Sequence, residues 1–564
     1  MSYGNWPEIK INGFTVDTTG EGTPIEEVVV DDDLELPTTF ALTLRTPGQD
    51  MPPYRIGHKV EISSPSGMIE TPLVSGEITT ITADYDQSGQ RLHIRGYDVS
   101  HRLHRGRQTR TFANVTDSDI CRRIASDAAI DTGKIDESGT THEHVSQANQ
   151  SDWDFLKARA RAIGFLLNVD DGKLNFTKPL DSSTAPDEGN LLETVQYKLV
   201  FGSDLLEYRP RLSSAEQVSQ VEVRGWDREN KRELVGQAVA GTKAAQISET
   251  SPGSLAQTFG GQTFVQANHP GTSSDEVDAA ADAVAEHIGS GFAEAEGVSR
   301  GNGDLRAGTT VSISGVADAF CGRFVLTHTR HVFAEGGYRT HFEINGHHRR
   351  SLLGLVTLAS TGGATNGKVG SDRVYGVVTA VVTGNDDPAG QGRVKIRLPW
   401  LSGDYESNWT SVVQAGAGPN SGSVYLPEVG DEVLVSFENG NVSLPFVIGG
   451  LYNGQDKPNL GDGLFDNGKV KRRGFVSRKG HRLIFFDSDG DSGIALISSD
   501  NKLRIALRES GDELHIYGET KVVIESAQEI DLKSQGTLSL ESQGKLTIKS
   551  SGAVDIDGSV IQLN

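Results

Sequence analysis

Cysteine is nearly absent from this sequence, which has only Cys121 and Cys321 among its 564 residues. Neither belongs to a CxxC pair, so a disulfide framework is excluded. No apolar run approaches the roughly eighteen residues of a transmembrane helix, and the first ten residues lack a basic stretch followed by an apolar one. We therefore expect a chain that assembles in a reducing cytoplasm without a signal peptide.

Positive charge is also scarce. The sequence has 53 Lys and Arg against 76 Asp and Glu, which gives a formal net charge of −23. This balance argues against nucleic acid or an anionic membrane as the main partner. The length predicts roughly three to five domains, and the many glycines and strand-forming residues predict a mainly β fold.

The sequence is rich in one feature, a repeat in its last fifty or so residues. Two apolar residues flank one polar residue, and this motif recurs every eight positions from Leu514/Ile516 onward. Alternation is typical of a short strand, and Gly536, Gly544 and Gly552 indicate a bend after each strand. The later pairs, which we predict to form the core of a needle, are Val522/Ile524, Ile530/Leu532, Leu538/Leu540, Leu546/Ile548 and Val554/Ile556.

An eight-residue repeat predicts a trimer. One turn of a single-chain β-solenoid needs roughly twenty residues or more, whereas eight residues supply one strand and one corner. Three chains wound around a common axis could each contribute one strand per rung and point its apolar pair inward. A further column with the same spacing alternates in charge, and opposite charges would meet in rungs about 4.8 Å apart. Its members are Glu525, Lys533, Glu541, Lys549 and Asp557. The alternative is an ordinary meander with a solvated face.

The front of the chain contains a second, weaker repetition. The segment around Val60 and Ile62 resembles the segment around Val311 and Ile313, and later strand-like motifs follow in the same order in both regions. We interpret these regions as two copies of one β-barrel, although glycine-rich strands can also resemble each other by chance. Three chains with two barrels each would form a ring of six similar units, which could dock on a hexameric tube.

These patterns divide the chain into seven regions. Helices are expected at 117–128, from residue 151 to 163, and at 274–288, where apolar stripes and capping residues occur. The regions are a first hub β-barrel at 1–98, an inserted α+β domain at 99–190, a second hub barrel at 191–355, a linker at 356–372, an OB-fold at 373–455, a connector at 456–475 and a β-helical spike at 476–564.

Several motifs resemble one known family. The stretches Gly392–Trp400, Leu426–Val435 and Ile448–Gly454 are similar in sequence and order to the OB-fold of VgrG-type spike proteins. These proteins belong to type VI secretion systems, contractile phage tails and extracellular contractile injection systems. The segment 96–107 and the start of the helix at 151 resemble the family's hub, and 477–487 resembles the entry to its needle.

The resemblance implies a homotrimer that caps the hexameric inner tube at a baseplate and ends in an intertwined β-prism. It also implies a PAAR-like tip protein, and cargo effectors are a further class of partner. The octad phase breaks near the C-terminus, where we expect the tip protein to contact Val560, Ile561, Gln562, Leu563 and Asn564. The short connector and the end of the repeat near residue 564 favour a lean spike without an added enzyme domain, in a particle that is released or retained by the cell.

Other motifs are interpreted without catalysis, metal or cofactor. His142 and His144 are two ligands where structural zinc needs four, and the segment from Asp487 to Asp491 lacks the later ligands of a calcium loop. The concentrated basic residues Arg102, Arg105, Arg107 and Arg110 are expected to pair with carboxylates within the subunit or at a subunit interface. The rival functions are a trimeric spike with peptidoglycan-hydrolase activity and a receptor-binding tail fibre.

Overall fold

The computed structural model describes residues 6–18, 25–46, 53–66, 69–87, 89–187, 197–267, 271, 273–335, 337–346, 373–461, 463–488 and 490–562. Contacts divide the chain into two units, Met1–Leu451 and Tyr452–Asn564. The expected linker at 356–372 lies outside the described residues, as do Leu563 and Asn564 of the expected tip contact. Among the described helices, none is long and apolar enough to cross a membrane.

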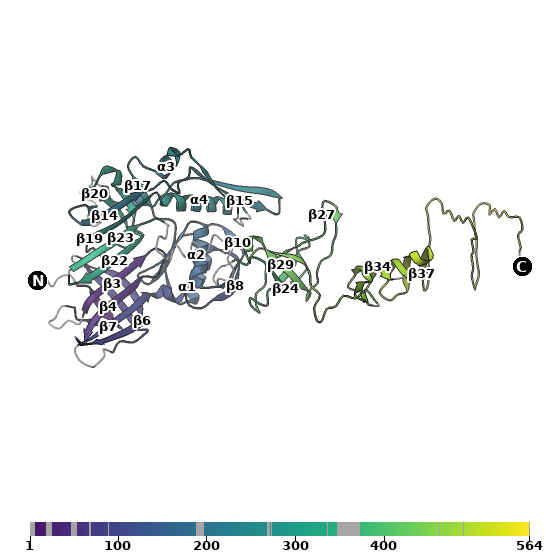
Figure 1. Ribbon diagram of the computed structural model, residues 1–564, viewed down its shortest axis with the longest axis horizontal. Coiled ribbons are helices and arrows are strands. Elements are labelled where there is room, and N and C mark those ends of the chain that lie inside the picture. Colours follow the sequence, from purple (N-terminus) through teal and green to yellow (C-terminus); the bar gives the residue numbers. More distant parts are fainter. Residues whose placement is uncertain are drawn as a thin grey trace. The chain divides into compact units, whose positions relative to one another are not determined.

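An eleven-stranded sheet dominates the first unit (Figure 1). Its strand order is β14-β19-β23-β22-β3-β4-β7-β6-β5-β1-β2. The strands are β1 (Glu8–Ile11), β2 (Phe14–Val16), β3 (Ile25–Asp33), β4 (Thr39–Thr46), β5 (Lys59–Ser66), β6 (Ile69–Asp86), β7 (Gly89–Asp98), β14 (Leu205–Leu212), β19 (Ala293–Arg300), β22 (His328–Ala334) and β23 (Gly337–Ile344).

The two expected hub barrels therefore share one sheet rather than forming two closed, separate barrels. The junction is an antiparallel ladder between β3 and β22, in which Val28 pairs with Phe333 and Asp33 with His328. Phe333 and Tyr338 belong to the second region but pack in the same core as the apolar residues of β3, β4 and β7. Alternation along these strands buries one face and leaves the other in solvent.

The inserted α+β domain has its own core around Trp153, Phe112 and Phe176. The helices α1 (Asp117–Asp127) and α2 (Asp152–Ala162) start where capping residues predict, because Thr116 and Ser151 accept hydrogen bonds from the backbone N–H groups of Asp119 and Asp154. Its strands are β8 (Gln108–Thr116), β9 (Asp131–Ile135), β10 (Thr141–Gln150), β11 (Leu166–Asp170) and β12 (Lys173–Thr177).

Two smaller sheets complete the second hub region. The helix α4 (Ser274–Ser290) covers the sheet β16-β15-β18 and packs Val277 and Ala281 against Val221 and Val223. The short helix α3 (Pro252–Thr258) has no counterpart among the expected helices. The remaining strands are β13 (Lys198–Val200), β15 (Gln220–Asp227), β16 (Arg232–Val239), β17 (Ala245–Ile247), β18 (Thr263–Gln266), β20 (Thr310–Ser314) and β21 (Gly322–Val325).

An OB-type barrel ends the first unit. Its five-stranded sheet has the order β25-β24-β29-β30-β26 and encloses Val382, Ile396, Val433 and Val447. The barrel contacts the rest of the unit through Arg228, which forms an ion pair with Glu438 and lies 4.4 Å from the centre of the Phe446 ring. The strands are β24 (Val377–Gly384), β25 (Lys395–Arg397), β26 (Ser411–Val412), β27 (Ala417–Gly418), β28 (Ser421–Gly422), β29 (Glu432–Phe437) and β30 (Pro445–Gly450).

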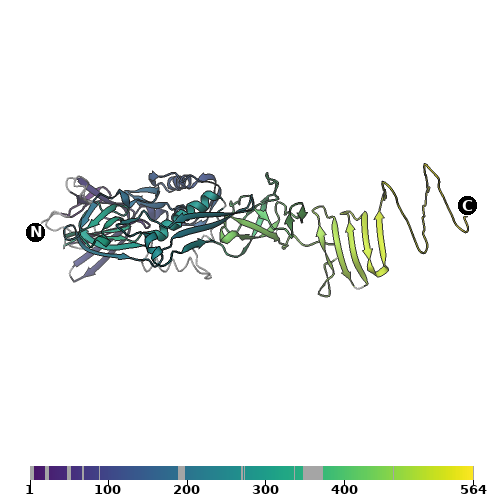
Figure 2. The same ribbon diagram turned by 90° about the horizontal axis from the view of Figure 1, so that it is seen from above.

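The second unit begins with short strands and then forms a five-stranded antiparallel meander. Figure 2 shows its strands as arrows lying side by side. Each strand of the meander pairs only with its neighbours in the chain, from β33 to β37. The strands are β31 (Phe465–Asp466), β32 (Lys469–Val470), β33 (Arg472–Val476), β34 (Arg482–Ser488), β35 (Asp491–Ile497), β36 (Leu503–Arg508) and β37 (Glu513–Gly518).

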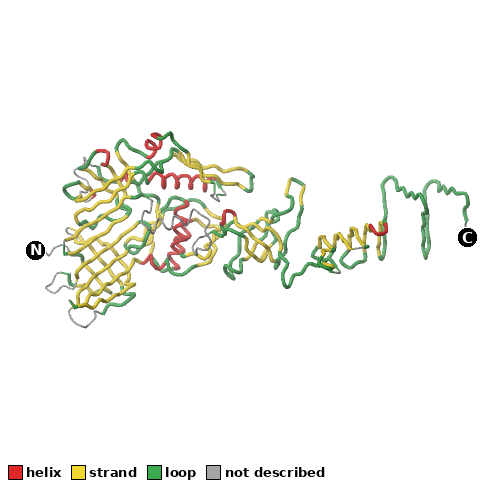
Figure 3. The backbone as a smooth tube through the Cα atoms, viewed as in Figure 1, coloured by secondary structure: helices red, strands yellow, loops and turns green. Residues whose placement is uncertain are grey.

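The octads, which are expected to form strands in a trimer, are mostly unpaired in the single chain. Of the repeat, only Leu514 and Ile516 lie in a strand, and residues 519–562 form no helix or strand (Figure 3). A strand is defined by a neighbour that accepts and donates its backbone hydrogen bonds. Successive octads of one chain do not supply that neighbour, so the extended segments of a single chain remain unpaired. Residues 560–562, where the tip protein is expected to bind, likewise form no strand in the single chain.

Candidate functional site

The predicted needle core is a column of apolar side chains that a single chain does not bury. The sequence predicts that three chains bury this column together, and in the structure of one chain every member of the column is exposed. The exposed fractions are 52% for Val522, 68% for Ile524, 50% for Ile530, 64% for Leu532, 58% for Leu538, 65% for Leu540, 60% for Leu546, 65% for Ile548, 52% for Val554 and 67% for Ile556.

The physical reason is the missing second layer. Each octad contributes one extended segment, and no other part of the described chain packs over its apolar pair. Single exposed apolar residues are ordinary on protein surfaces, but a long contiguous series of them marks an interaction surface. The geometry of one chain therefore leaves this column open for a partner.

The same column extends backward into the meander, which the sequence analysis did not include beyond Leu514 and Ile516. Cross-strand registers align Phe485, Ile494, Leu507 and Leu514 in one row, and Leu483, Leu496, Ile505 and Ile516 in the next. Both rows lie on the same face because their members are two residues apart along each strand. Apart from Leu483, each of these side chains exposes 38% or more of its surface. The meander therefore presents an apolar face across β34 to β37.

The corners between octads use a serine that the sequence analysis missed. The Oγ atoms of Ser534, Ser542 and Ser550 each accept a hydrogen bond from the N–H group of the glycine two residues later, at 3.1–3.3 Å. A hydroxyl that bonds the backbone two residues on stabilises a turn. The signal was available in the sequence, since serine recurs every eight residues, two positions before each glycine.

The expected tip contact is described only in part. Val560 and Ile561 expose 75% and 53% of their surfaces, and Gln562 is exposed as well. Their position at the end of the described chain adds two large apolar side chains to the series that begins in the meander. Leu563 and Asn564 are outside the described residues.

The basic cluster divides into paired and unpaired arginines. Arg102 forms an ion pair with Glu77, and Arg110 contacts Asp127 at 3.0 Å and also pairs with Asp152. Arg107 donates to the backbone oxygen of Asn149 at 2.8 Å. Within the described part of the chain, the Arg105 side chain has no hydrogen bond or ion pair and is exposed. The cluster is thus partly satisfied within the subunit.

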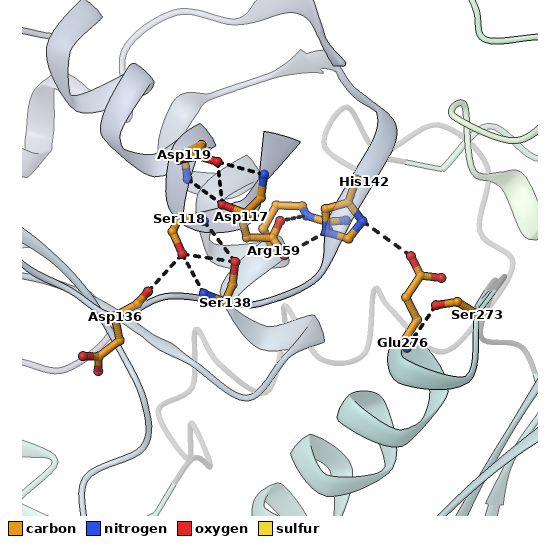
Figure 4. Close-up of polar contacts among 10 residues, drawn as sticks. Asp117, Ser118, Asp119, Asp136, Ser138, His142, Arg159, Ser273 and Glu276 are labelled. Carbon is orange, nitrogen blue, oxygen red and sulfur yellow. Dashed lines mark hydrogen bonds and ion pairs between the residues drawn. The ribbon is translucent and has the colours of Figure 1, made fainter. Parts of the chain in front are cut away.

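His142, considered above as a metal ligand, belongs instead to a network of charged groups (Figure 4). Its Nε2 lies 3.1 Å from Asp117 Oδ2, and its Nδ1 lies 3.5 Å from Glu276 Oε1 on α4. Arg159 Nε donates to Asp117 Oδ1 at 2.5 Å. This network joins the inserted domain to α4.

The network changes the proton affinity of its members. Burial lowers the pKa of His142, but the hydrogen bonds to Asp117 and Glu276 outweigh burial, so that the pKa is raised. Burial raises the pKa of Asp117, but the hydrogen bond with His142 and the charge of Arg159 bring it below its usual value. Both shifts favour the charged forms, as expected for a structural ion-pair network. No group of three or more potential metal-ligating His, Cys, Asp and Glu occurs among the described residues.

A second buried network holds the two hub regions and the inserted domain together. Arg306 Nε donates to Asp32 at 3.1 Å, Nη2 donates to Asp170 at 3.0 Å, and Nη1 donates to the oxygen of Pro72 at 2.7 Å. Asp32 also accepts from Thr38 Oγ1 at 2.9 Å. Because Arg306 and these partners come from three regions of the sequence, Arg306 fixes the relative placement of the regions within the first unit.

Two family descriptions match this chain. Residues 49–335, just over half of its length, match the Alg8 N-terminal domain. Residues 378–452 match the type VI secretion system/phage-baseplate injector OB domain, which confirms the predicted OB-fold.

Curated relatives agree with the second of these matches. The type VI secretion system spike protein VgrG1c of Pseudomonas aeruginosa is 40% identical over 93 residues, which are 14% of this chain and 12% of that protein. The actin cross-linking toxin VgrG1 of Vibrio cholerae is 38% identical over 71 residues, which are 12% of this chain and 6% of that protein. The matched stretches thus span only a small part of these relatives.

The structural likeness to a known protein covers much more of this chain than the sequence matches do. A lidded PdpA–VgrG complex of Francisella has a TM-score of 0.52 at 11% identity, with 91% of this chain and 80% of that chain covered. This likeness confirms the mainly β fold over most of the chain. From these matches, the chain belongs to the Alg8 N-terminal domain family, and its OB region is similar to that of VgrG-type spike proteins.

Proposed function

We propose that the chain forms a homotrimer that is the structural hub and cell-puncturing spike of a contractile injection machine. The observation that carries this proposal is the column of exposed apolar pairs from the meander to Ile556. Three copies would bury the column around one axis and supply the backbone hydrogen bonds that one chain leaves open. The resulting needle would be stiff, because its strands would have no free lateral edge.

The hub sheet supports the duplication expected from the sequence. The strand order β14-β19-β23-β22 follows the same pattern as β3-β4-β7-β6. In the second set, β21 and β22 occupy the place of the long strand β6, with a break at Leu326 and Thr327. Three chains would then present six similar units to a hexameric inner tube.

The remaining parts of the proposal follow from this arrangement. The trimer would cap the inner tube at the baseplate, and sheath contraction would drive it through the target envelope. A PAAR-like protein would cover the end formed by Val560 and Ile561, and cargo effectors would travel with the particle. The chain would act mechanically rather than as an enzyme. It would assemble in the cytoplasm, in a particle that is then released or retained.

Sedimentation equilibrium tests the proposal with three versions of the chain. The full chain should have the mass of a trimer. A version cut after Gly518 keeps the whole meander but loses the octads, and a version cut after Gly511 also loses β37. We expect the trimer to weaken with the first cut and to be lost with the second. A full-length monomer, or a trimer that survives both cuts, would contradict the proposal.

A further inference from the structure

The solvent face of the hub sheet carries a row of residues with arginines at both ends. Cross-strand registers align Arg300 with Arg339, Arg339 with Val332, Val332 with Val29, Val29 with Ala41, and Ala41 with Arg95. These six residues, here called the arginine row, come from β19, β23, β22, β3, β4 and β7, which lie side by side in Figure 1. Between Arg339 and Arg95, the row consists of the small or β-branched residues Val332, Val29 and Ala41.

The arginine row places like charges directly opposite each other. Arg300 and Arg339 face each other across β19 and β23, and in the neighbouring row Arg330 faces His341. Like charges in directly opposed positions destabilise a sheet, so this arrangement requires a compensating benefit. Burial, followed by the charges of Arg330 and Arg339, lowers the pKa of His341, which indicates a locally positive environment in a chain with a net charge of −23.

The carboxylates near the arginine row face other groups. Asp31 pairs with His328 and lies 3.8 Å from Arg330. Glu296 lies 4.0 Å from Arg209. On β3, Glu27 faces Thr43 of β4 rather than an arginine. These carboxylates leave the arginines at the two ends of the row without neutralising partners.

The guanidinium groups at the ends of the row are open to solvent. Among the described residues, those of Arg95 and Arg339 have no hydrogen bond or ion pair, and both side chains are exposed. Arg300 uses its Nε to donate to the oxygen of Ser203 at 2.9 Å. The positive ends of the row are therefore available to an external anion.

We propose that the arginine row is a docking surface for a polypeptide segment with acidic residues at both ends and small apolar residues between them. From β23 to β7 the row crosses four inter-strand steps, or roughly 19 Å at about 4.8 Å per step. About six residues of extended chain span that length. Carboxylates at the ends of such a segment would reach Arg300 and Arg339 on one side and Arg95 on the other, where arginine forms bidentate contacts.

The middle of the row favours polypeptide over nucleic acid. The half-buried Val332 and Ala41, on either side of the buried Val29, offer apolar contact where a nucleic acid would need further cations for its evenly spaced phosphates. The exposed aromatic residue beside the row is Tyr97, whereas single-stranded nucleic acid binds by stacking on a series of aromatic rings. The overall negative charge also repels a polyanion, while a short segment experiences mainly the local field.

Fluorescence anisotropy with labelled peptides tests this proposal on the full chain. The probe is Glu-Glu-Val-Ala-Val-Ala-Glu-Glu, and the control peptide of equal composition is Glu-Val-Glu-Ala-Glu-Val-Glu-Ala. We expect saturable binding that favours the probe and weakens with salt. The double variant Arg95→Ala/Arg339→Ala should weaken binding about tenfold, which is the loss of two charge-assisted contacts. The matched variant Arg209→Ala/Arg211→Ala, whose arginines pair with Glu207 and Glu294 on the same sheet face, should change it less than twofold.

Three results would overturn the proposal. The first is absence of saturable binding, and the second is an equal loss in both double variants, which would indicate non-specific attraction. The third is tighter binding of a twelve-nucleotide single-stranded DNA than of the probe. Sedimentation of the Arg95→Ala/Arg339→Ala variant provides the remaining check, because a changed subunit number would assign the row to a contact between copies of the chain.

Discussion

The hub sheet and the predicted needle both contain alternating apolar and polar residues, but in one chain the apolar side chains are buried in the hub and exposed in the needle. In the hub sheet, Leu92 and Ile94 of β7 are completely buried, whereas Leu540 in the octads is 65% exposed. Both segments alternate apolar and polar residues, so alternation alone specifies a face but not what covers that face. The difference lies in the connections between strands.

Hub strands are joined by turns and crossovers that bring each strand beside another strand of the same chain. The meander does so as well, since its strands pair with their neighbours in sequence. The octads leave only a few residues between short extended segments, which is enough for a corner but not for a second sheet layer. The lesson is that repeat length, rather than hydrophobic content, distinguishes a self-sufficient core from one that needs other chains.

The largest expected effect follows from placing charge in the needle. Leu540→Asp would bring three carboxylates to the proposed axis, and each buried unpaired charge costs several kcal/mol. We expect loss of the trimer, measured by sedimentation equilibrium. Ser539→Asp is the matched control, because Ser539 alternates with the apolar pair and faces the other way. An unchanged mass for Leu540→Asp would contradict the predicted needle core.

The next largest effect is expected in the hub sheet, whose core is formed by residues of a single chain. Arg306→Ala removes the partner of buried Asp32 and should lower the free energy of unfolding of the first unit by about 3 kcal/mol. Urea unfolding followed by tryptophan fluorescence measures this loss. Arg209→Ala, whose ion pair is exposed, should cost less than about 1 kcal/mol. Equal losses in the two variants would show that the buried network has no special role.

A pH experiment examines the β3–β22 junction. Burial lowers the pKa of His328, but hydrogen bonds to Asp31 and Glu343 outweigh it and raise the pKa to about 10. A raised pKa means that the stabilisation is complete below pH 6.5 and is lost as the pH rises through 10. The stability difference between the native chain and His328→Gln should therefore shrink by on the order of 2 kcal/mol across this window. A difference that stays constant with pH would contradict a charged His328.

The smallest effect on folding is expected in the basic cluster. Neutralising Arg105 and Arg107 with Arg105→Gln/Arg107→Gln should leave unfolding of a subunit within about 0.5 kcal/mol, since both side chains are exposed. The same variant should weaken the trimer if these arginines lie at a subunit interface. Sedimentation at decreasing protein concentration measures that change, and an unaltered trimer would refute the interface role.

The sequence predicted the parts that rest on local patterns. The helix starts at Thr116 and Ser151 follow from capping residues, and the OB-fold follows from family motifs. The exposure of Leu532 and Ile548 in one chain agrees with the eight-residue spacing, which is too short for one chain to cover its own apolar pairs.

Two further features could not be predicted, because the residues that form them are not regularly spaced in the sequence. The apolar pairs of the meander begin at Leu483, Ile494, Ile505 and Leu514, so their spacing is eleven, eleven and nine residues rather than eight. The arginine row could not be predicted, because its six residues come from six strands whose order depends on long-range pairing.

In the proposed trimer, the unequal hairpins of the meander have a consequence for how the three chains align. Five similar octads would allow one chain to slide by a full repeat while its apolar pairs still meet apolar pairs. Such a slip would bring Glu525 beside Glu541 in the alternating column, where like charges repel. The meander cannot slide in this way, because its strands are not copies of the octads. The meander would therefore set the register of the three chains, so that the octads assemble without slipping by a repeat.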